Sequence, residues 1–179
     1  EVEPDVVIGV GGYDSGPAVL AAVWKGIPTL AFEPNVVPGF AHRVVDRWVS
    51  AAAVHFEQSA HFFRRAQVTG VPVRREFFQI PERPAHARPT LLIFGGSQGS
   101  HAINQAVIGS LPGLVAALSD LHMIHQTGER DYPFAEAEYL RTTMGTGLSA
   151  EVSPFIDDMP RAFAAADLIV SRSGASTVA

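Results

Sequence analysis

Short runs of apolar, mostly β-branched residues alternate with longer segments of helical periodicity along the whole chain. The runs predict strands at residues 6–10, 29–32, 51–55, 66–69, 90–94, 122–126 and 167–171. The segments between them predict helices at residues 15–25, 39–49, 57–65, 100–119, 132–143 and 157–166. Most runs are apolar at nearly every position, which is typical of parallel strands that helices cover on both faces. The pattern therefore predicts an α/β fold with parallel sheets.

One stretch breaks this alternation. Residues 79–89 contain Pro81, Pro84 and Pro89 and almost no apolar side chain. Proline removes a backbone donor and fixes φ, so such a stretch extends neither a helix nor a sheet. We interpret it as a linker between two domains, residues 1–78 and residues 90–179.

The composition excludes several classes of protein. Of the 179 residues, 47% are hydrophobic and 17% are charged, which is too apolar for a disordered chain. No apolar run approaches the ~18 residues that a membrane span needs. The net charge of −5 argues against a nucleic-acid partner, so any bound phosphate is expected to be held locally. The chain has no cysteine, which excludes disulfides and thiolate metal sites and fits a reducing compartment such as the cytoplasm.

Two glycine-rich turns follow predicted strands and precede predicted helices. The first spans residues 9–17 (GVGGYDSGP) and the second spans residues 95–100 (GGSQGS). Glycine allows a tight turn that leaves backbone N–H groups free at a helix N-terminus, where the helix dipole favours an anion. Both turns are therefore candidate phosphate sites, although each can also serve only as a steric link between a strand and a helix.

Neither turn matches a nucleotide-binding fingerprint. Gly9 and Gly11 would need a glycine or alanine at position 14, where the chain has Asp14, and no Lys-Ser or Lys-Thr pair completes a P-loop. A third turn, residues 171–177, places small hydroxyl residues beside Arg172 after the last predicted strand. All three turns are expected to face one cleft at the carboxyl ends of the strands.

Four ordered motifs carry a resemblance to a known family. They are GGY at 11–13, GGSQG at 95–99 followed by Asn104, FIDDM at 155–159, and RSGA at 172–175. Together they resemble the MurG-type UDP-N-acetylglucosamine:N-acetylmuramyl-(pentapeptide) pyrophosphoryl-undecaprenol N-acetylglucosaminyltransferases. The resemblance spans nearly the whole chain and implies the GT-B fold, in which two Rossmann-like parallel-sheet domains face a cleft.

Two such domains need roughly 300 residues. The chain opens at Glu1 rather than at a methionine and ends directly after a Ser-Gly turn. We therefore expect it to be the middle of a longer protein, with each domain only partly present.

The resemblance also implies roles for residues of the first half. The turn with Gly11, Gly12, Tyr13 and Ser15 would face the diphosphate of the acceptor. Asn35 would contact the donor sugar, although Phe32 and Pro34 depart from the family's usual His-Glu-Gln-Asn pattern around it. Near the linker, Arg74 would contact the donor, where a guanidinium suits a diphosphate. Without the family, Arg74 would be interpreted as a solvated surface charge.

In the second half, the resemblance assigns most contacts to the donor nucleotide. Ser97 would meet the UDP diphosphate, and the backbone of Ile156, otherwise an ordinary core residue, would read the edge of the uracil. The segment that would surround the ribose and phosphates comprises Ser173, Gly174, Ala175, Ser176 and Thr177. The family's ribose-binding glutamate would follow Ala179, and its other glycine-rich loop, with a histidine, would precede Glu1.

The implied reaction is an inverting transfer without a metal or other cofactor. A sugar hydroxyl of the acceptor attacks the anomeric carbon of UDP-N-acetylglucosamine and releases UDP, so the enzyme must accept a proton and stabilise the leaving diphosphate. Asp14 and Glu33 are the carboxylates in the predicted cleft loops, but an exposed carboxylate of ordinary pKa is a poor base. We therefore expect the base to lie outside this chain.

The remaining features give weaker signals. His122 and His125 are three positions apart on a predicted strand, which places them on opposite faces and argues against a shared metal ion. His42, His55, His61, His86 and His101 show no pattern of metal ligands. Trp24 beside Lys25 suits a membrane interface as well as half-buried packing. With the resemblance, it predicts a peripheral enzyme on the cytoplasmic face of the plasma membrane, acting on undecaprenyl-pyrophosphoryl-muramyl-pentapeptide.

Two other kinds of function stay open. Another GT-B enzyme that uses a UDP-sugar, such as a glycolipid glycosyltransferase or a UDP-N-acetylglucosamine 2-epimerase, would share the fold and the nucleotide cleft. A non-catalytic module that binds a nucleotide sugar would need neither the base nor the ribose glutamate.

Overall fold

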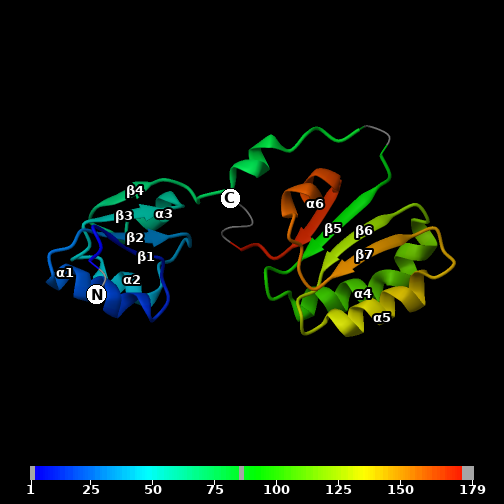
Figure 1. The fold of residues 1–179 in the computed structure, drawn as a ribbon, viewed down its shortest axis with the longest axis horizontal. Helices are drawn as coiled ribbons and strands as arrows, with labels where there is room; N and C mark the ends of the chain where they lie inside the picture. The colour runs from blue at the N-terminus through cyan, green and yellow to red at the C-terminus, as the bar shows by residue number, and fades with distance from the viewer. Residues whose placement is uncertain (1–2, 85–86, 175–179) are drawn as a thin grey trace. The chain divides into compact units, whose positions relative to one another are not determined.

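A computed structural model describes residues 3–84 and 87–174, and its contacts divide the chain into two compact units. Unit 1 runs to Val73, and unit 2 comprises Arg74–Ser173. Each unit contains one sheet of four parallel strands with helices packed against it (Figure 1). The expected α/β class with parallel sheets is thereby confirmed.

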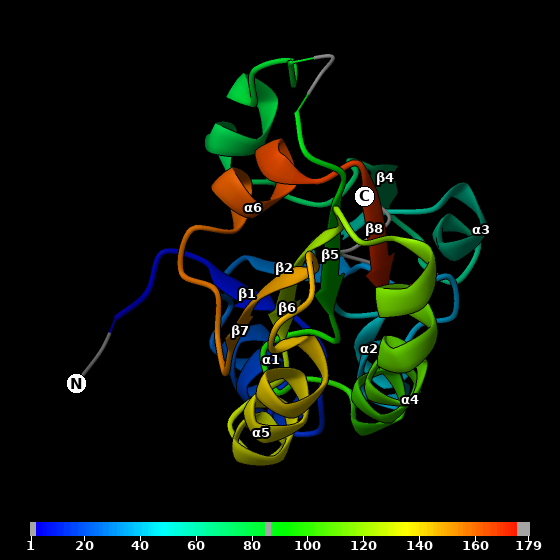
Figure 2. The same cartoon turned by 90° about the vertical axis from the view of Figure 1, so that its right-hand side faces the viewer.

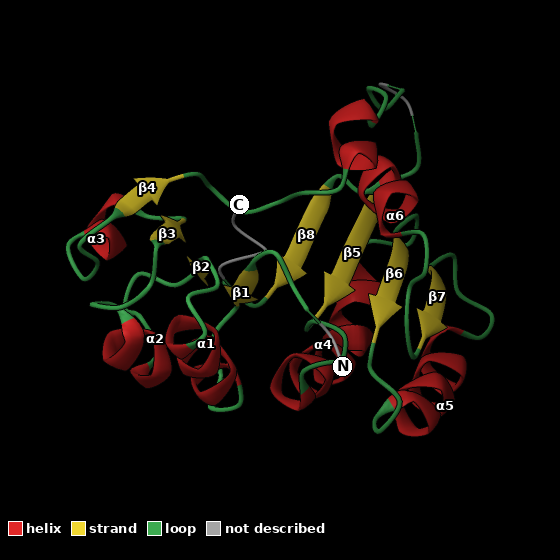
Figure 3. Ribbon diagram, turned by 60° about the vertical axis from the view of Figure 1, so that its left-hand side comes forward, coloured by secondary structure: helices red, strands yellow, loops and turns green. Residues whose placement is uncertain are grey.

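Unit 1 is built on a sheet in which the strands follow their order along the chain. The strands are β1 (Val7–Gly9), β2 (Thr29–Glu33), β3 (Ala51–Val54) and β4 (Ala66–Val68). The helices are α1 (Ser15–Trp24), α2 (Phe40–Val45) and α3 (Glu57–Ala60). Helices α1 and α2 pack against each other below the sheet in Figure 3, and α3 contacts β3 and β4. The hydrophobic core between the sheet and the helices includes Val19, Ala31, Val45, Val54 and Phe63.

Unit 2 has a sheet whose order differs from the order of the chain, β7-β6-β5-β8. Its strands are β5 (Thr90–Phe94), β6 (His122–Gln126), β7 (Ser149–Ser153) and β8 (Leu168–Ser171). Its helices are the 3-10 helix η1 (Arg75–Gln79), α4 (His101–Ala117), α5 (Tyr132–Thr143) and α6 (Met159–Ala165).

Helices cover both faces of the unit 2 sheet at its central strand β5. Helices α4 and α5 lie on one side of the sheet and α6 on the other (Figure 2). Alternate residues of β5 therefore enter different clusters: Ile93 packs with Leu111 and Met123, whereas Leu92 packs with Ala162 of α6. This two-sided burial is the reason that the strand is apolar at every position after Thr90.

Three expectations about the elements need correction. Strand β7, with the sequence SAEVS, was not predicted, because it lies at the edge of the sheet and only two of its residues are apolar. The helix expected at 39–49 ends at Val45, after which Trp48 and Val49 both donate to the Val45 carbonyl in a turn. The helix expected at 57–65 is only Glu57–Ala60.

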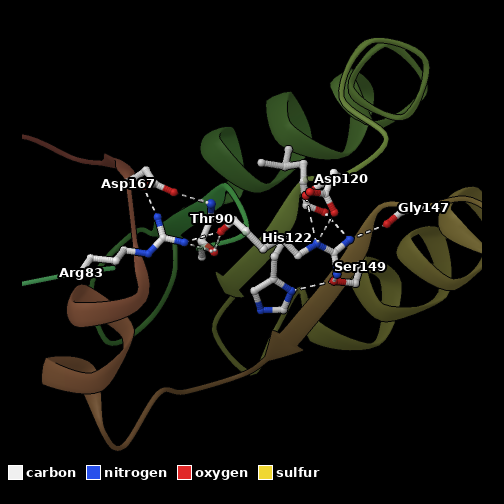
Figure 4. Close-up of polar contacts among 9 residues, drawn as sticks. Arg83, Thr90, Asp120, His122, Gly147, Ser149 and Asp167 are labelled. Carbon is white, nitrogen blue, oxygen red and sulfur yellow. Dashed lines mark hydrogen bonds and ion pairs between the residues drawn. The ribbon is translucent and has the colours of Figure 1, made fainter. Parts of the chain in front are cut away.

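The segment expected to be a linker forms an ion pair and several hydrogen bonds with unit 2. Arg83 forms an ion pair with Asp167 and donates to the Thr90 hydroxyl at 3.2 Å. Arg88 donates to the Ser149 hydroxyl at 2.7 Å and to the Asp120 carbonyl at 2.9 Å (Figure 4). These contacts lie at the amino ends of β5, β7 and β8. Immediately before the expected linker, Arg75–Gln79 form the 3-10 helix η1, whose last residue is the first residue of that segment.

Candidate functional site

The second glycine turn connects β5 to α4 and exposes its backbone. Gly96 and Gly99 have φ of 89° and 71°, a region that favours glycine, and the Gly99 N–H donates to the Gly96 carbonyl at 2.8 Å. A Cβ on Gly99 would lie 1.9 Å from the Thr127 carbonyl oxygen, so no other residue fits there. Ser97 lies at the exposed tip of this turn. The turn is therefore rigid and presents a hydroxyl and backbone groups to solvent.

A cation lies against this turn. A Cβ on Gly96 would be 2.9 Å from the Nη2 atom of Arg172, so the guanidinium of Arg172 covers the glycine. Arg172 directly follows β8, which pairs with β5 through Phe94 and Ser171. The parallel pairing thus brings an arginine from the third turn to the second turn. Ser97 and Arg172 together suit an anion such as a diphosphate.

Gln126 joins the second turn to the loop that contains Ile156. The side chain of Gln126 is 2% exposed; its amide nitrogen donates to the Gly96 carbonyl at 2.8 Å, and its amide oxygen accepts from the Ile156 N–H at 2.9 Å. Gln126 is the last residue of β6, opposite Phe94 of β5. One buried amide therefore positions two segments that the sequence predicts to bind different parts of a nucleotide.

The carboxyl ends of all four strands in unit 2 lie at one edge of the sheet. Figure 3 shows the four arrows pointing the same way, and the pairs Phe94–Gln126, Gln126–Ser153 and Phe94–Ser171 place the ends in register. The predicted residues Ser97, Ile156 and Ser173 all follow these ends, whereas the contacts of Gly174 group it with unit 1. The structure thus brings the unit 2 candidates to one edge. Ala175, Ser176 and Thr177 lie outside the described residues.

Beneath the turn, a polar network crosses the core of unit 2. Asn104 is fully buried; its amide nitrogen donates to the Thr127 carbonyl and to Asp131, each at 2.8 Å, and its amide oxygen is 3.1 Å from Nε2 of His125. The other ring nitrogen of His125 is 3.0 Å from the Tyr139 hydroxyl. Burial lowers the pKa of His125 to about 4, so the ring is neutral at pH 7. The network thus holds the Thr127 carbonyl, against which Gly99 of the second turn packs.

Arg74 lies at the start of unit 2, at the N-cap of η1. Its side chain is exposed, and the guanidinium carbon lies 5.2 Å from the centre of the Phe77 ring. Phe77 in turn packs edge-on against Phe163 of α6 at 5.2 Å. The donor contact expected of Arg74 stays a prediction.

In unit 1, the first glycine turn lies between β1 and α1. Gly11 and Gly12 have φ of 90° and 80°, and the Ser15 hydroxyl donates to the Gly12 carbonyl at 3.0 Å. Tyr13 is 84% exposed. Ser15 therefore closes the turn, while Tyr13 and the backbone of the glycines face outward.

The second candidate of unit 1 is the loop after β2, where one expectation is wrong. Glu33 is not a solvated carboxylate: it is 2% exposed and accepts hydrogen bonds from Asn35, Gly39 and His42. Burial alone would raise the pKa of Glu33, but the hydrogen bonds from His42, Asn35 and Gly39 hold it below its usual value. Both the backbone and the side-chain amide of Asn35 donate to Glu33 Oε1, at 3.0 and 2.8 Å. Phe32 and Pro34 thus leave an ordered loop around Asn35.

Two further expectations concern metals and membranes. His122 lines a pocket with Ala162 of α6, whereas His125 contacts Tyr139 of α5, so the prediction that they face opposite sides of the sheet is confirmed. Within residues 3–84 and 87–174, no group of three or more His, Asp or Glu side chains is arranged to hold a metal ion. No helix in that same part of the chain is long and apolar enough to cross a bilayer.

Comparison with known proteins agrees with this arrangement. Residues 90–179 match the glycosyltransferase family 28 C-terminal domain, and residues 1–54 match the N-terminal domain of the same family. The chain belongs to glycosyltransferase family 28. The two parallel α/β units are those of the GT-B fold, as the sequence motifs imply.

Two curated relatives in this family carry the same name, UDP-N-acetylglucosamine–N-acetylmuramyl-(pentapeptide) pyrophosphoryl-undecaprenol N-acetylglucosamine transferase. The protein from Anaeromyxobacter sp. (strain K) is 44% identical over 98% of this chain and 46% of its own length. The protein from Myxococcus xanthus is 43% identical over 99% of this chain and 46% of its own length. The chain thus spans about half the length of the curated relatives it matches.

Solved structures in the same comparison share the fold. The crystal structure of Acinetobacter baumannii MurG is 34% identical, with a TM-score of 0.71 over 97% of this chain and 48% of that one. The Staphylococcus aureus MnaA–UDP co-structure is 13% identical, with a TM-score of 0.64, and covers 96% of this chain and 54% of that one. The second likeness is one of fold alone.

Sequence reasoning missed three residues of the site or treated them too lightly: Gln126, Arg172 and His42. Gln126 had a detectable signal, because it is a polar residue at the end of a predicted strand, two positions before Gly128. Arg172 stands beside the third turn in the sequence, and nothing in the local pattern indicates that it reaches the second turn. His42 gave no signal, since its partners Gly9 and Glu33 lie on two different strands.

Proposed function

We propose that this chain carries the donor-nucleotide site and the acceptor-side turn of an inverting N-acetylglucosaminyltransferase. The reaction would move N-acetylglucosamine from UDP-N-acetylglucosamine to undecaprenyl-pyrophosphoryl-muramyl-pentapeptide, a step in peptidoglycan synthesis. The names of the curated relatives support the substrate pair. The observation that carries the proposal is the rigid turn at Gly96 and Gly99, with Ser97 at its tip and Arg172 against it.

In this reaction the leaving UDP develops negative charge on its diphosphate. Fixed hydrogen-bond donors and a permanent cation stabilise such charge without reorganising, which lowers the barrier. The Ser97 hydroxyl, the backbone N–H groups of the turn and the Arg172 guanidinium would supply these groups, and Arg74 would add a second cation. In this arrangement these groups would stabilise the leaving diphosphate without a metal ion.

The other half of the nucleotide would lie along the same edge of unit 2. Ile156 would read the uracil through its backbone, and Gln126 holds that backbone in a fixed position relative to Gly96. The segment from Ser173 to Thr177 would surround the ribose and phosphates. In unit 1, Asn35 would contact the donor sugar, and Gly11, Gly12, Tyr13 and Ser15 would meet the acceptor diphosphate.

The proton of the attacking hydroxyl needs an acceptor. Glu33 is unsuited to this role, because its two oxygens already accept four hydrogen bonds and its pKa is lowered. A carboxylate in that state is a weak base. This role is therefore not assigned to a residue of this chain.

Calorimetry on this chain tests the donor site. We expect UDP-N-acetylglucosamine to bind more tightly than UDP-glucose, and Ser97→Ala and Arg172→Ala each to weaken it by about tenfold, since each removes one hydrogen bond to a charged group. The matched controls are Ser110→Ala and Arg141→Ala, both exposed positions on α4 and α5. Binding that is indifferent to the Ser97 and Arg172 variants would contradict this placement of the diphosphate.

A transfer assay separates this function from the alternatives. With a lipid-linked muramyl-pentapeptide as acceptor, a longer form of the protein that includes this chain should release UDP only when the acceptor is present. Conversion of the donor without an acceptor would instead indicate a 2-epimerase. Donor binding with no turnover in either assay would favour a non-catalytic module.

We also propose that one surface of unit 1 rests on the cytoplasmic face of the plasma membrane. This surface, the α1–α2 groove, is lined by the apolar residues Tyr13, Pro17, Leu20, Phe40 and Val44. Tyr13 and Phe40 are 84% and 69% exposed.

Positions around the α1–α2 groove suit an interface with lipid. Trp24, at the end of α1, is 87% exposed. The basic residues Lys25, Arg43 and Arg47 are exposed on the same two segments of chain. Apolar residues beside basic ones are typical of proteins that lie on an anionic bilayer.

Co-sedimentation with vesicles tests this surface. The chain should bind vesicles that contain phosphatidylglycerol and bind much less to vesicles of phosphatidylcholine alone. The double variant Trp24→Ala and Phe40→Ala should lose most of the binding, whereas Phe134→Ala, a half-exposed aromatic on α5 of unit 2, should keep it. Equal binding by all three proteins would contradict the assignment of the surface.

A further inference from the structure

His42 of α2 is a buried histidine that contacts two parts of unit 1. It is 1% exposed. Its Nδ1 atom lies 2.9 Å from Oε2 of Glu33, and its Nε2 atom lies 3.1 Å from the carbonyl oxygen of Gly9. The edge of the ring also faces Phe63, with ring centres 6.2 Å apart. Both polar contacts of the ring are therefore with oxygen atoms.

Neither neutral form of the ring satisfies both contacts. A carbonyl oxygen and a carboxylate oxygen only accept hydrogen bonds, whereas a neutral imidazole donates from one nitrogen and presents a lone pair at the other. A proton on Nε2 alone would leave the Nδ1 lone pair facing the carboxylate. A proton on Nδ1 alone would leave the Nε2 lone pair facing the Gly9 carbonyl. Only the doubly protonated ring donates to both.

A neutral His42 could still form both hydrogen bonds if Glu33 were protonated and donated to Nδ1. The groups around Glu33 disfavour that protonated form. Besides His42, Glu33 accepts from the backbone N–H groups of Asn35 and Gly39 and from the side-chain amide of Asn35. Such donors stabilise the ionised carboxylate. A buried charge is tolerated when it is paired and hydrogen-bonded, and the Glu33 carboxylate has a partner at each contact.

We propose that His42 is a buried imidazolium that pairs with the Glu33 carboxylate and so fixes the first glycine turn and the Asn35 loop in one arrangement. On the side of the turn, it holds the Gly9 carbonyl, and a Cβ on Gly11 would lie 3.6 Å from the Cε1 atom of the ring. On the other side, Glu33 accepts hydrogen bonds from both His42 and Asn35 and so links the two residues. His42 is thus a positioning residue for the two segments of unit 1 that would meet the substrates.

The protonation state does not depend on the proposed function, but the relevance of the two loops to catalysis rests on it. The test therefore reads the ring directly. In a chain labelled with ¹⁵N-histidine, nuclear magnetic resonance at pH 7.5 should show a proton on both ring nitrogens of His42. A neutral tautomer at this pH would overturn the proposal, whether or not the chain binds a nucleotide sugar.

Two variants sharpen this measurement. Glu33→Gln removes the paired charge and should abolish the imidazolium signals of His42 at the same pH. The matched control is Glu57→Gln, an exposed carboxylate at the start of α3 in the same unit, which should preserve them. Imidazolium signals that persist in Glu33→Gln would overturn the pairing.

The positioning role has a separate measurement. His42→Leu keeps an apolar body in the core but removes both hydrogen bonds, so the amide signals of Gly11, Gly12 and Asn35 should all shift. Arg43→Gln, an exposed neighbour on the same helix, should leave them in place. Unshifted signals in a folded His42→Leu chain would overturn the coupling of the two loops. If that variant does not fold, the wild-type and Glu33→Gln spectra still decide the protonation state.

Discussion

At the scale of single residues, the polar groups buried beneath the candidate site determine how unit 2 responds to pH. His125 is completely buried, and burial lowers its pKa from 6.5 to about 4. Burial likewise raises the pKa of its partner Tyr139, which stays neutral. Because the unfolded chain takes up a proton near pH 6.5 and the folded chain does not, acid favours unfolding across this interval.

We predict that unit 2 loses about 3 kcal/mol of stability as the pH falls from 6.5 to 4, since each unit of pKa shift corresponds to about 1.4 kcal/mol. The lowered pKa values of carboxylates such as Asp131 act mainly below this interval. Hydrogen exchange of the β5 and β6 amides measures the effect. His125→Gln should flatten the pH dependence, and His61→Gln, at an exposed position in unit 1, should leave it unchanged. An equally steep dependence in His125→Gln would assign the effect to another group.

The glycines of the second turn give a prediction about shape. Gly99→Ala forces a Cβ into the Thr127 carbonyl at a φ of 71° and should cost about 1–3 kcal/mol and weaken UDP binding. Gly109→Ala is the matched control, because open space surrounds that position in α4 and alanine favours a helix by about 0.5–1 kcal/mol. Thermal unfolding of both variants measures the difference. If Gly99→Ala left the stability unchanged, the close approach of the second glycine turn to the Thr127 carbonyl would be contradicted.

Sequence alone reached part of this site. The two glycine turns could be predicted, because a glycine-rich segment between a strand and a helix is a local pattern. The roles of Ser97 and Asn35 rest on the resemblance to the family and stay predictions. The contacts of Gln126, Arg172 and His42 could not be predicted, since each joins segments that come together only through the register of neighbouring strands. Glu33 illustrates the same limit: its sequence context indicates a loop carboxylate, and only the packing of α2 against the sheet shows that it is buried.

At the scale of elements, patterns of burial explain which strands could be predicted. Strands covered on both faces, such as β5, are continuously apolar and could be predicted closely. The edge strand β7 is half-exposed and polar at alternate positions, so its pattern does not stand out. The order β7-β6-β5-β8 depends on how the crossover helices pack, which no local pattern encodes.

The contacts of Arg88 predict how the segment before β5 contributes to stability. Its guanidinium donates to the carbonyls of Asp120, Leu121 and Gly147 and to the Ser149 hydroxyl (Figure 4). Arg88→Ala leaves these acceptors without their charged donor and should destabilise unit 2 by about 2 kcal/mol. Arg141→Ala breaks only an exposed pair with Glu138 on α5, which water and salt screen, and should leave the stability of unit 2 nearly unchanged. Urea unfolding compares the two; equal losses would mean that Arg88 acts only as a surface charge.

At the scale of the whole molecule, each sheet has an edge strand with exposed apolar side chains. Strand β1 is at one edge of the unit 1 sheet, and Ile8 within it is 54% exposed. Strand β8 is at one edge of the unit 2 sheet, and Leu168 within it is 63% exposed. An apolar edge strand offers unpaired backbone groups to another chain. The relatives are about twice as long as this chain, so they have additional residues that can cover such edges.

We therefore predict that this chain by itself self-associates through β1 and β8. Size-exclusion chromatography with light scattering should show species larger than the 19.1 kDa monomer, in amounts that rise with concentration. Ile8→Lys with Leu168→Lys should shift the population toward monomer, because a lysine on an edge strand opposes pairing with a second chain. Leu140→Lys, which changes an exposed leucine on α5 that belongs to neither β1 nor β8, is the matched control and should leave the distribution unchanged. If it dissociates the assemblies equally well, association runs through a general apolar surface, and the edges of the two sheets are not its cause.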